Sequence, residues 1–371
     1  MTAAIPPKRS LLARAADDRM VVAVALALAA TAVVVASGQL SGYRVNTLGQ
    51  LACFALLALA LDLIWGYAGI LSLGHGLFFA IGGYVVGMHL LERSVAETGV
   101  TPDIVQFMGW KALPGWWGPL ESFPVALLAA IGVSFAVALV FGWASFRSRV
   151  SGVYFAIITQ ALVYVAMLLM FRNDTGFGGN NGMTGFQVVF GVPIQDPAVT
   201  KGLALASVLV LLAALVGCRL LMIGRFGRLL VATRDDEVRL RSLGYETLRL
   251  KLKVWCLSAV LAALAGLLYV PQVGIINPRV LSPELSIEIA VWCAIGGRGR
   301  LAGAIIGAVL VNAVKFALSA SLPELWPFVL AALVIVVALI FPNGLLDLGK
   351  WKPTLLSRAR TEGRDAMSMT P

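Results

Sequence analysis

Long apolar stretches, separated by shorter polar ones, run along most of this chain. They lie near residues 21–38, 47–65, 68–91, 123–146, 152–171, 202–223, 254–275, 285–297, 302–320 and 326–341. A helix needs about 20 mainly apolar residues to cross the hydrocarbon core of a bilayer, and most of these stretches approach that length. The pattern predicts an all-α polytopic membrane protein with about ten transmembrane helices.

The composition of the chain favours a membrane protein over a soluble one. Of its 371 residues, 59% are hydrophobic and 13% are charged, and the mean hydropathy is +0.89. A soluble domain carries charge at about a quarter of its residues. The net charge of +10 does not indicate a nucleic-acid partner, because basic and aromatic residues do not alternate along any stretch.

The distribution of basic residues predicts the topology and the division of the chain. Lys and Arg gather near the N-terminus, between Arg225 and Lys253, and after Lys350. Short cytoplasmic segments of membrane proteins carry an excess of these residues, so we expect both termini to be cytoplasmic. The predicted divisions are a cytoplasmic segment at 1–20, a transmembrane domain at 21–341 with a cytoplasmic loop at 224–253, and a basic cytoplasmic tail at 342–371.

The N-terminal apolar stretch and two glycine-rich stretches bear on how the chain is organised in the membrane. The basic start followed by VVAVALALAATAVVVAS also fits a cleaved signal peptide, but the apolar stretch is long for one and further membrane segments follow. We therefore expect it to form the first spanning helix. The glycine-rich stretches Gly66–Gly87 and Gly296–Gly307 occupy comparable places in the two halves of the chain, which predicts an internal repeat.

Few residues indicate catalysis, metal binding or a cofactor site. The four cysteines form no CxxC pair, and with two histidines in the chain we expect no metal site. The stretch GLLDLGKW at 344–351 matches part of a phosphate-binding loop. However, Trp351 follows where Ser or Thr is required, and a membrane segment precedes it instead of a strand. We therefore expect no nucleotide site in this chain.

Glycines and polar side chains concentrate in the apolar stretch Gly66–Tyr84. Glycine in a helix interior costs about 1 kcal/mol relative to alanine. In membrane helices it permits close packing, or it marks a break that exposes backbone to a polar path. We predict a break at Ser72–Gly76. The glycines predicted to serve packing or breaks are Gly69, Gly74, Gly76, Gly82, Gly83, Gly299, Gly303 and Gly307.

The function of His75 has three possible interpretations. It is expected to be a hydrogen-bonded structural residue or to line a path, and catalysis is disfavoured because no nucleophile and acid accompany it. Asp62 and Lys315 lie near segment ends and are expected to reach the membrane surface. Glu288 lies deeper, and a carboxylate within the membrane is a functional candidate.

The stretch GFGGNNGMTGF at 176–186 predicts either turns with positive φ or an amide-rich lip facing a polar solute. The polar residues predicted to line a solute path are Ser72, His75, Gln160, Asn180, Asn181, Gln272, Asn277 and Glu288.

The loop between Arg225 and Lys253 contains eight basic and four acidic residues among Leu and Val. One interpretation is a basic amphipathic helix that lies on anionic lipid headgroups. The adjacent acids of the RDDE stretch bind such a surface poorly, so the alternative is a short helix that docks into a protein groove. Gly244 is expected to end that helix as a C-cap.

Three stretches together carry a resemblance to a known family. They are LDLIWGYAG at 61–69 followed by LSLGHG, RDDEVRLRSLGY at 234–245, and AIGGRG at 294–299. They resemble the membrane subunits of ATP-binding-cassette importers in the branched-chain amino-acid permease family. The resemblance covers about residues 47–346 and implies a multi-pass protein of the bacterial inner (plasma) membrane.

The resemblance also implies partners. These are a second related permease, a periplasmic solute-binding protein, and two cytoplasmic ATPase subunits that bind ATP and Mg, while this chain holds no cofactor. The cytoplasmic helix would insert into an ATPase groove. The residues expected to serve this coupling are Arg234, Asp235, Asp236, Glu237, Arg239, Arg241 and Gly244. Arg239 and Arg241 depart from the family pattern, which prefers small residues there.

Further stretches look more like the urea permease of this family, in its larger, M-type subunit. They are GGNNGMT at 178–184, YVPQVGIINP at 269–278 and SIEIAVW at 286–292. The resemblance implies that the chain forms half of a path for urea or a short amide. A branched-chain amino-acid permease is the alternative, and a secondary transporter or channel that acts alone is the second alternative.

Overall fold

The computed structural model describes residues 19–150 and 152–340, and these residues form a bundle of long helices. The helices of the first half are α2 (Arg19–Ser37), α3 (Gly42–Asp62), the π-helical turn η1 (Leu63–Tyr67), α4 (His75–Thr98), α5 (Asp103–Phe107), the 3₁₀ turn η2 (Gly115–Glu121), α6 (Phe123–Arg147) and α7 (Val153–Phe171). Next come the 3₁₀ turns η3 (Asn173–Thr175) and η4 (Gly179–Asn181), then β1 (Met183–Thr184), β2 (Val188–Val189), β3 (Val192–Pro193) and α8 (Pro197–Ile223). The remaining elements are α9 (Arg225–Asp235), α10 (Glu237–Ser242), α11 (Thr247–Val273), β4 (Ile275–Ile276), η5 (Pro278–Leu281), α12 (Pro283–Gly296), α13 (Leu301–Ser321), η6 (Pro323–Leu325) and α14 (Trp326–Ile340).

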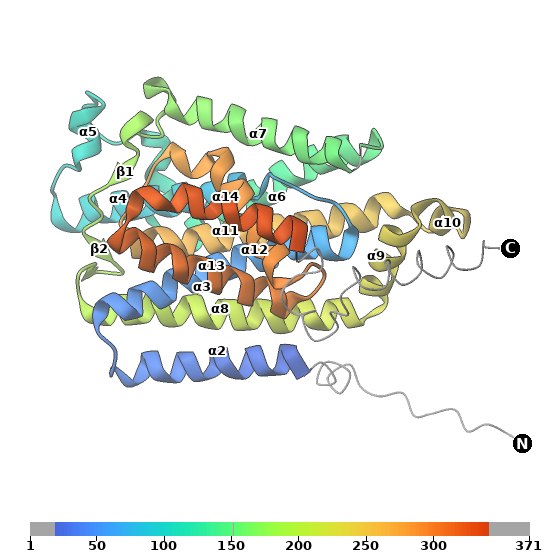
Figure 1. The fold of residues 1–371 in the computed structure, drawn as a ribbon. Helices are drawn as coiled ribbons and strands as arrows, with labels where there is room; N and C mark the ends of the chain where they lie inside the picture. Colours follow the sequence, from blue (N-terminus) through green and yellow to red (C-terminus); the bar gives the residue numbers. More distant parts are fainter. Residues whose placement is uncertain (1–18, 151, 341–371) are drawn as a thin grey trace, which may run out of the picture.

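The long helices run roughly side by side, with α3 and α11 at the centre of the bundle (Figure 1). Within the most apolar stretch of each helix, 83% of the residues of α3 with η1 and 72% of those of α11 are buried. The corresponding share is 17% for α2 and 28% for α6 and α7. All of these helices are apolar around most of their circumference. Central helices therefore bury their side chains in protein, while peripheral ones leave theirs exposed, as membrane helices do toward lipid.

Every predicted apolar stretch contains a helix, and seven helices in the described residues are long and apolar enough to cross a membrane. They are α2, α3 with η1, α6, α7, α8, α11 and α13. The all-helical membrane architecture is thereby confirmed. α12 and α14 are shorter and α4 is more polar, so the ten crossings, the internal repeat and the topology stay predictions.

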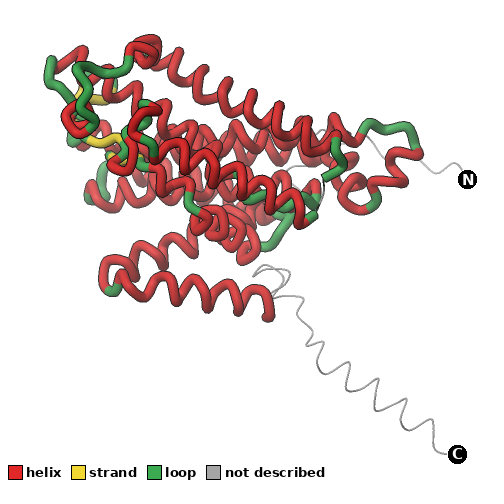
Figure 2. Tube along the Cα trace, turned by 90° about the horizontal axis from the view of Figure 1, so that it is seen from above, coloured by secondary structure: helices red, strands yellow, loops and turns green. Residues whose placement is uncertain are grey.

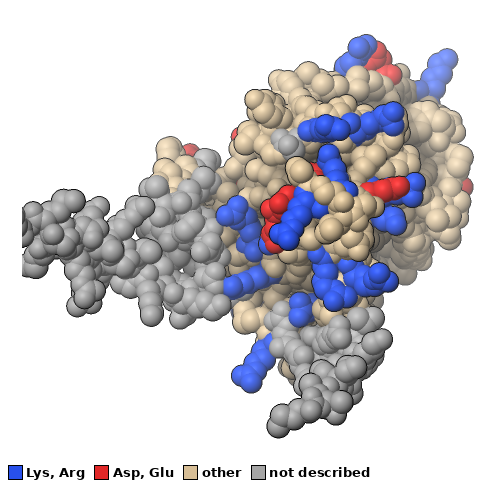
Figure 3. All heavy atoms as spheres, turned by 90° about the vertical axis from the view of Figure 1, so that its right-hand side faces the viewer, with Lys and Arg blue, Asp and Glu red and all other residues tan. Residues whose placement is uncertain are grey.

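The two ends of the bundle differ in structure and charge. The end that carries α9 and α10, called here the α10 end, gathers Lys and Arg side chains on its surface (Figure 3). The opposite end, called here the loop end, holds α5 (Figure 1) and the short strands, which are yellow in Figure 2. There β1 pairs antiparallel with β4, and β2 forms a hairpin with β3. The phosphate-loop-like stretch 344–351, most of segment 1–20 and the tail 342–371 lie outside the described residues.

The chain leaves helical geometry between α3 and α4. Residues 69–74 have no helical assignment, and α4 begins at His75. The non-helical segment therefore starts earlier than the predicted break, and His75 and Gly76 form the first turn of α4. Irregular backbone within a membrane domain is tolerated where protein or a polar cavity surrounds it.

Candidate functional site

Hydroxyl groups hold the non-helical segment 69–74 in place. The Ser72 hydroxyl accepts a 3.0 Å hydrogen bond from the Gly74 N–H, and the Ser72 side chain is buried. Thr159 of α7 accepts a 3.1 Å hydrogen bond from the Leu73 N–H. A Cβ at Gly74 would lie 3.1 Å from Thr159 Cβ, so the segment and α7 are in close contact. We call this segment and the side chains around it the break site.

His75 belongs to a hydrogen-bonded chain across three helices. Its Nε2 lies 2.6 Å from the Ser258 hydroxyl of α11, and that hydroxyl donates to the Ala60 carbonyl of α3. Because Ser258 has one proton to give, Nε2 must carry the proton of the imidazole and donate it. Nδ1 is then the bare nitrogen, and it has no partner among the described residues. The ring packs edge-on against Trp255, with centroids 5.7 Å apart.

Other buried polar atoms of α7 and α12 also lack partners among the described residues. They include the Ser286 hydroxyl of α12 and both polar atoms of the Gln160 amide on α7. A Cβ at Gly76 would lie 3.5 Å from Ser286 Oγ, and Gln160 follows Thr159 directly in sequence. α7 packs against α4, η5 and α12. Buried polar groups in proteins are normally hydrogen-bonded, so the Ser286 hydroxyl gives the break site spare hydrogen-bonding capacity.

The structure places the other predicted path residues elsewhere. Gln272 donates to Ser207 of α8 at 2.9 Å and to the Leu268 carbonyl of its own helix at 2.6 Å, while its amide oxygen has no partner among the described residues. The Asn277 side chain caps η5 by accepting from the Arg279 N–H at 3.1 Å. Asn180 and Asn181 are exposed at the loop end. The glycines around them have positive φ, which matches the turn interpretation of this loop.

Glu288 takes part in an ion pair within the helical bundle. Both of its carboxylate oxygens lie 2.8 Å from Lys315 Nζ on α13, and the Trp326 indole of α14 donates to it at 3.1 Å. Asp62 is fully buried and accepts the Gly299 N–H at 2.7 Å. Asp62 is thus enclosed by protein, and Lys315 is paired with Glu288; their position relative to the membrane surface stays a prediction.

Glycines allow several helices to approach closely. A Cβ at Gly82 would collide with the Ala263 backbone of α11, and one at Gly83 would lie 2.9 Å from Val270. Cβ atoms at Gly303 or Gly307 would collide with the backbone of α12. Gly266 of α11 makes the reciprocal contact with the Phe79 backbone and was not singled out from the sequence, because a lone glycine in an apolar run has no spacing partner.

The acidic stretch of the loop 224–253 is used inside the protein. Asp236 separates α9 from α10 and caps α10 by accepting from the Arg239 N–H at 2.9 Å. Glu237 accepts from Arg241 and Lys251 at 2.5 Å each and from Thr247 at 2.9 Å. We call these four side chains the Glu237 cluster. Burial raises the pKa of Glu237, but the hydrogen bonds from Lys251 and Arg241 outweigh it and hold the pKa below its usual value.

Apolar side chains project from the other side of α10. Val238 is 74% exposed and Leu243 is 68% exposed. Gly244 follows with φ +86°, and its N–H donates to the Arg241 carbonyl at 2.9 Å, so it ends the helix in a conformation that favours glycine. α10 lies within the stretch 234–245 expected to form the short docking helix, and α9 precedes it as a separate helix. Glu237 is turned toward the bundle, whereas Asp235 and Asp236 are exposed.

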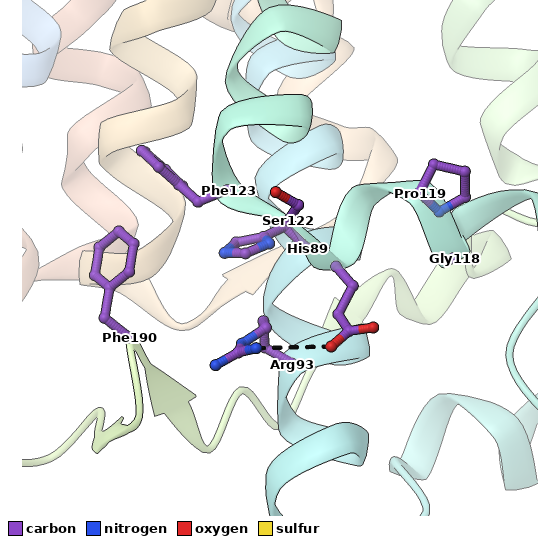
Figure 4. Close-up of a pocket in the computed structure, with 8 residues that line it drawn as sticks. His89, Arg93, Gly118, Pro119, Ser122, Phe123 and Phe190 are labelled. Carbon is purple, nitrogen blue, oxygen red and sulfur yellow. Dashed lines mark ion pairs between the residues drawn. The ribbon is translucent and has the colours of Figure 1, made fainter.

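A cavity of about 490 Å³ opens at the loop end (Figure 4). His89 lines it and donates from Nδ1 to the Leu120 carbonyl at 2.8 Å. Arg93 also lines it and forms ion pairs with Glu97 and, at 3.6 Å, with Glu121. Phe190 and Phe123 close one side, with ring centroids 5.0 Å apart. This cavity was not predicted from the sequence. The i, i+4 spacing of His89 and Arg93 on one face of α4 was a signal that could have indicated it.

Metal and thiol chemistry find no support in the described residues. Cys53, Cys218, Cys256 and Cys293 are buried and unpaired. No group of three His, Cys, Asp or Glu side chains in residues 19–150 and 152–340 is placed to hold a metal ion.

Comparison with known proteins places the chain in a family. A family model described as "Branched-chain amino acid transport system / permease component" matches residues 43–338. The chain is 27% identical over 317 residues to the high-affinity branched-chain amino acid transport system permease protein LivM of Salmonella typhimurium, covering 80% of this chain and 68% of that protein. It is 25% identical to LivH of Escherichia coli, covering 81% of this chain and 92% of that protein. It is also 27% identical to the autoinducer 2 import system permease protein LsrC of Yersinia enterocolitica, covering 72% of each chain. No solved structure matches the chain.

The matched region includes the break site, the Glu237 cluster and nearly all of the described helices. The protein is a multi-pass membrane subunit of a bacterial ATP-binding-cassette importer, and ATP is bound by partner ATPases. The chain therefore belongs to the family of branched-chain amino-acid transport system permease components.

Proposed function

We propose that this chain forms one half of the transmembrane path of an ATP-driven importer for branched-chain amino acids. The observation that carries the proposal is the break site. The Ser72 hydroxyl bonds within an irregular segment of an otherwise apolar bundle, and the Ser286 hydroxyl, which has no partner among the described residues, lies next to Gly76 at the start of α4. A solute with polar ends and an aliphatic side chain fits a path lined by few hydrogen-bonding groups among apolar ones.

The solute assignment follows the relatives. LivM and LivH are named for branched-chain amino-acid transport. This supports a branched-chain amino acid, the alternative solute, over urea, the solute expected from the sequence. The amide set expected to bind a neutral solute also lends urea little support. The Gln272 amide nitrogen and the Asn277 side chain bond within the protein, and Asn180 and Asn181 lie on the exposed loop end.

The proposal orients the chain with its α10 end in the cytoplasm. Lys and Arg gather at that end (Figure 3), as expected for cytoplasmic segments. The loop end would then face the periplasm, where a solute-binding protein meets the cavity around His89. A second related permease would supply the other half of the path.

In this orientation α10 is the element that docks to an ATPase subunit. Val238, Leu243 and Tyr245 are exposed by 74%, 68% and 43%. Apolar side chains that project into water beside a basic surface fit a groove on a partner protein better than open solvent. The Glu237 cluster fixes α10 to the start of α11, so movement of the ATPase would be delivered to the bundle.

Reconstitution of the complete importer tests the proposal. Vesicles that contain this chain, its partner permease and the ATPase subunits are loaded with ATP, and the binding protein is added outside. We expect ATP-dependent uptake of labelled leucine that excess urea does not inhibit. Urea uptake that leucine does not inhibit would overturn the solute assignment. Uptake by this chain alone without ATP would support the stand-alone transporter or channel and would overturn the mechanism.

A further inference from the structure

Arg234, the penultimate residue of α9, points toward the bundle. Its Nη1 donates a 2.9 Å hydrogen bond to the Gly66 carbonyl in η1, and its Nη2 lies 3.1 Å from Asp235. The sequence placed Arg234 among residues expected to contact an ATPase. The contact with Gly66 ties the end of α9 to η1, which continues α3.

Three chain segments meet beside Arg234, whose side chain is 41% exposed, and glycines allow their close contacts. Gly69 has φ +72°, and a Cβ there would lie 2.5 Å from Arg234 Cγ. A Cβ at Gly66 would collide with the Gly299 nitrogen, and Gly299 itself has φ +74°. The Asp62 carboxylate accepts the Gly299 N–H at 2.7 Å. The end of α9, the turn after α3 and the turn between α12 and α13 are therefore interlocked largely through backbone.

Both of these turns lead into the break site. Ser72 follows Gly69 by three residues, and Ser286 lies on α12, whose end at Gly296 leads into the turn at Gly299. The turn after α3 begins with η1, a π-helical turn, and such turns often occur at functional sites. A displacement of α9 at Arg234 would consequently reach the two sides of the break site together.

We infer that Arg234 is a positioning residue that links movement of the docking helix to both sides of the break site. The inference rests on the proposed function, because it requires an ATPase that moves α10. The hydrogen bond from Arg234 to Gly66 connects α9 to the turn after α3, and the contact of the arginine stem with Gly69 orients the guanidinium for this bond. Arg234 acts through Gly66 and the Gly299 turn and touches neither ATP nor solute.

Variants of Arg234 in the complete importer test this inference. Arg234→Met keeps a flexible stem over Gly69 and removes the hydrogen-bond donor, whereas Arg234→Lys keeps a donor. Arg228→Ala removes an exposed arginine from the same helix and is the matched control. Three quantities are measured: the ATPase that copurifies with the permease, the stimulation of ATP hydrolysis by solute-loaded binding protein, and ATP-driven leucine uptake.

We expect Arg234→Met to assemble normally but to lose about tenfold in stimulation and uptake, a typical size for coupling between two sites. Arg234→Lys should recover much of both, and Arg228→Ala should match the wild type. Wild-type stimulation and uptake in Arg234→Met would overturn the inference. Failure of either Arg234 variant to assemble would also overturn it, because the residue would then be structural. Absence of ATP-driven uptake in the wild-type complex would instead overturn the proposed function.

Discussion

Replacing Glu237 by Gln tests whether the Glu237 cluster holds α10 on the bundle. Gln keeps the size of the side chain and removes its charge. Lys251, whose side chain is only 10% exposed, then loses the carboxylate oxygen 2.5 Å from its Nζ. Arg241, at 42% exposed, also loses its partner but remains better hydrated. The variant therefore leaves one poorly solvated positive charge beside α10.

The size of the effect follows from the burial of these charges. Removing one member of a buried ion pair costs about 3–5 kcal/mol, whereas an exposed pair is worth about 0–1 kcal/mol. The Glu237 side chain is 25% exposed, so the pair with Lys251 lies between these limits. We expect a loss of about 2 kcal/mol, which makes the detached form of α10 about 30 times more populated.

Hydrogen exchange of the backbone amides in residues 237–245 measures this detachment, because local opening exposes them to solvent. The matched control is Glu246→Gln. Glu246 pairs with Arg249 at 2.6 Å, but the two side chains are 62% and 75% exposed, so its loss should change exchange little. Faster exchange in Glu237→Gln than in Glu246→Gln is expected. Equal exchange in the two variants would refute the claim that the cluster anchors α10.

Three further variants or conditions give separate expectations. The pKa of Glu237 is held below its usual value of 4.5, so its contribution to the attachment of α10 is complete above pH 4.5 and is lost as the pH falls below that value. Hydrogen exchange of the amides in residues 237–245 should therefore become faster as the pH is lowered through this range, after correction for the intrinsic pH dependence of exchange. Detachment of α10 on raising the pH would contradict this expectation. Gly82→Ala should lower the thermal unfolding temperature, since overpacking costs about 1–3 kcal/mol, whereas Gly202→Ala, with no atom within 4 Å of the new Cβ, should not. Gln160→Leu should raise thermal stability, because an unsatisfied buried polar group costs about 1–3 kcal/mol, while it lowers leucine uptake; loss of both would make Gln160 a structural residue.

The helices were predictable from the sequence, but their partners were not. Apolar length alone indicated the spanning segments, because a bilayer imposes nearly the same requirement on each of them. The position of Asp62 near a segment end was predictable, but its hydrogen bond from the N–H of Gly299, 237 residues away, was not. Lys315 likewise pairs with Glu288 across two helices. Such contacts depend on how helices rotate against each other, which the apolar pattern does not specify.

In the candidate site, too, the segments were predictable from the sequence and the contacts between them were not. Ser72 and the glycines near it were found because they interrupt an apolar stretch. Thr159 was missed, since a threonine inside a helix commonly bonds its own backbone, and its contact with Leu73 arises only from packing. The acidic residues around the end of α9 were recognised as unusual, but the inward orientation of Glu237 follows from its contact with Lys251 on α11. Sequence composition thus identified the segments, while tertiary contacts determined the function proposed for each residue.

Glu237 and Arg234 hold the docking helix to the bundle at two different places. Glu237 fixes α10 to α11, and Arg234 fixes the end of α9 to η1. Asp236 lies between them with extended backbone, so the two contacts are joined by a single non-helical residue. If movement passes from α10 through α9 to Gly66, the two contacts act in series. Combining Glu237→Gln with Arg234→Met should then reduce leucine uptake no further than the stronger single variant does. Losses that multiply in the double variant would mean that the two contacts act independently, because coupling energies of independent sites add.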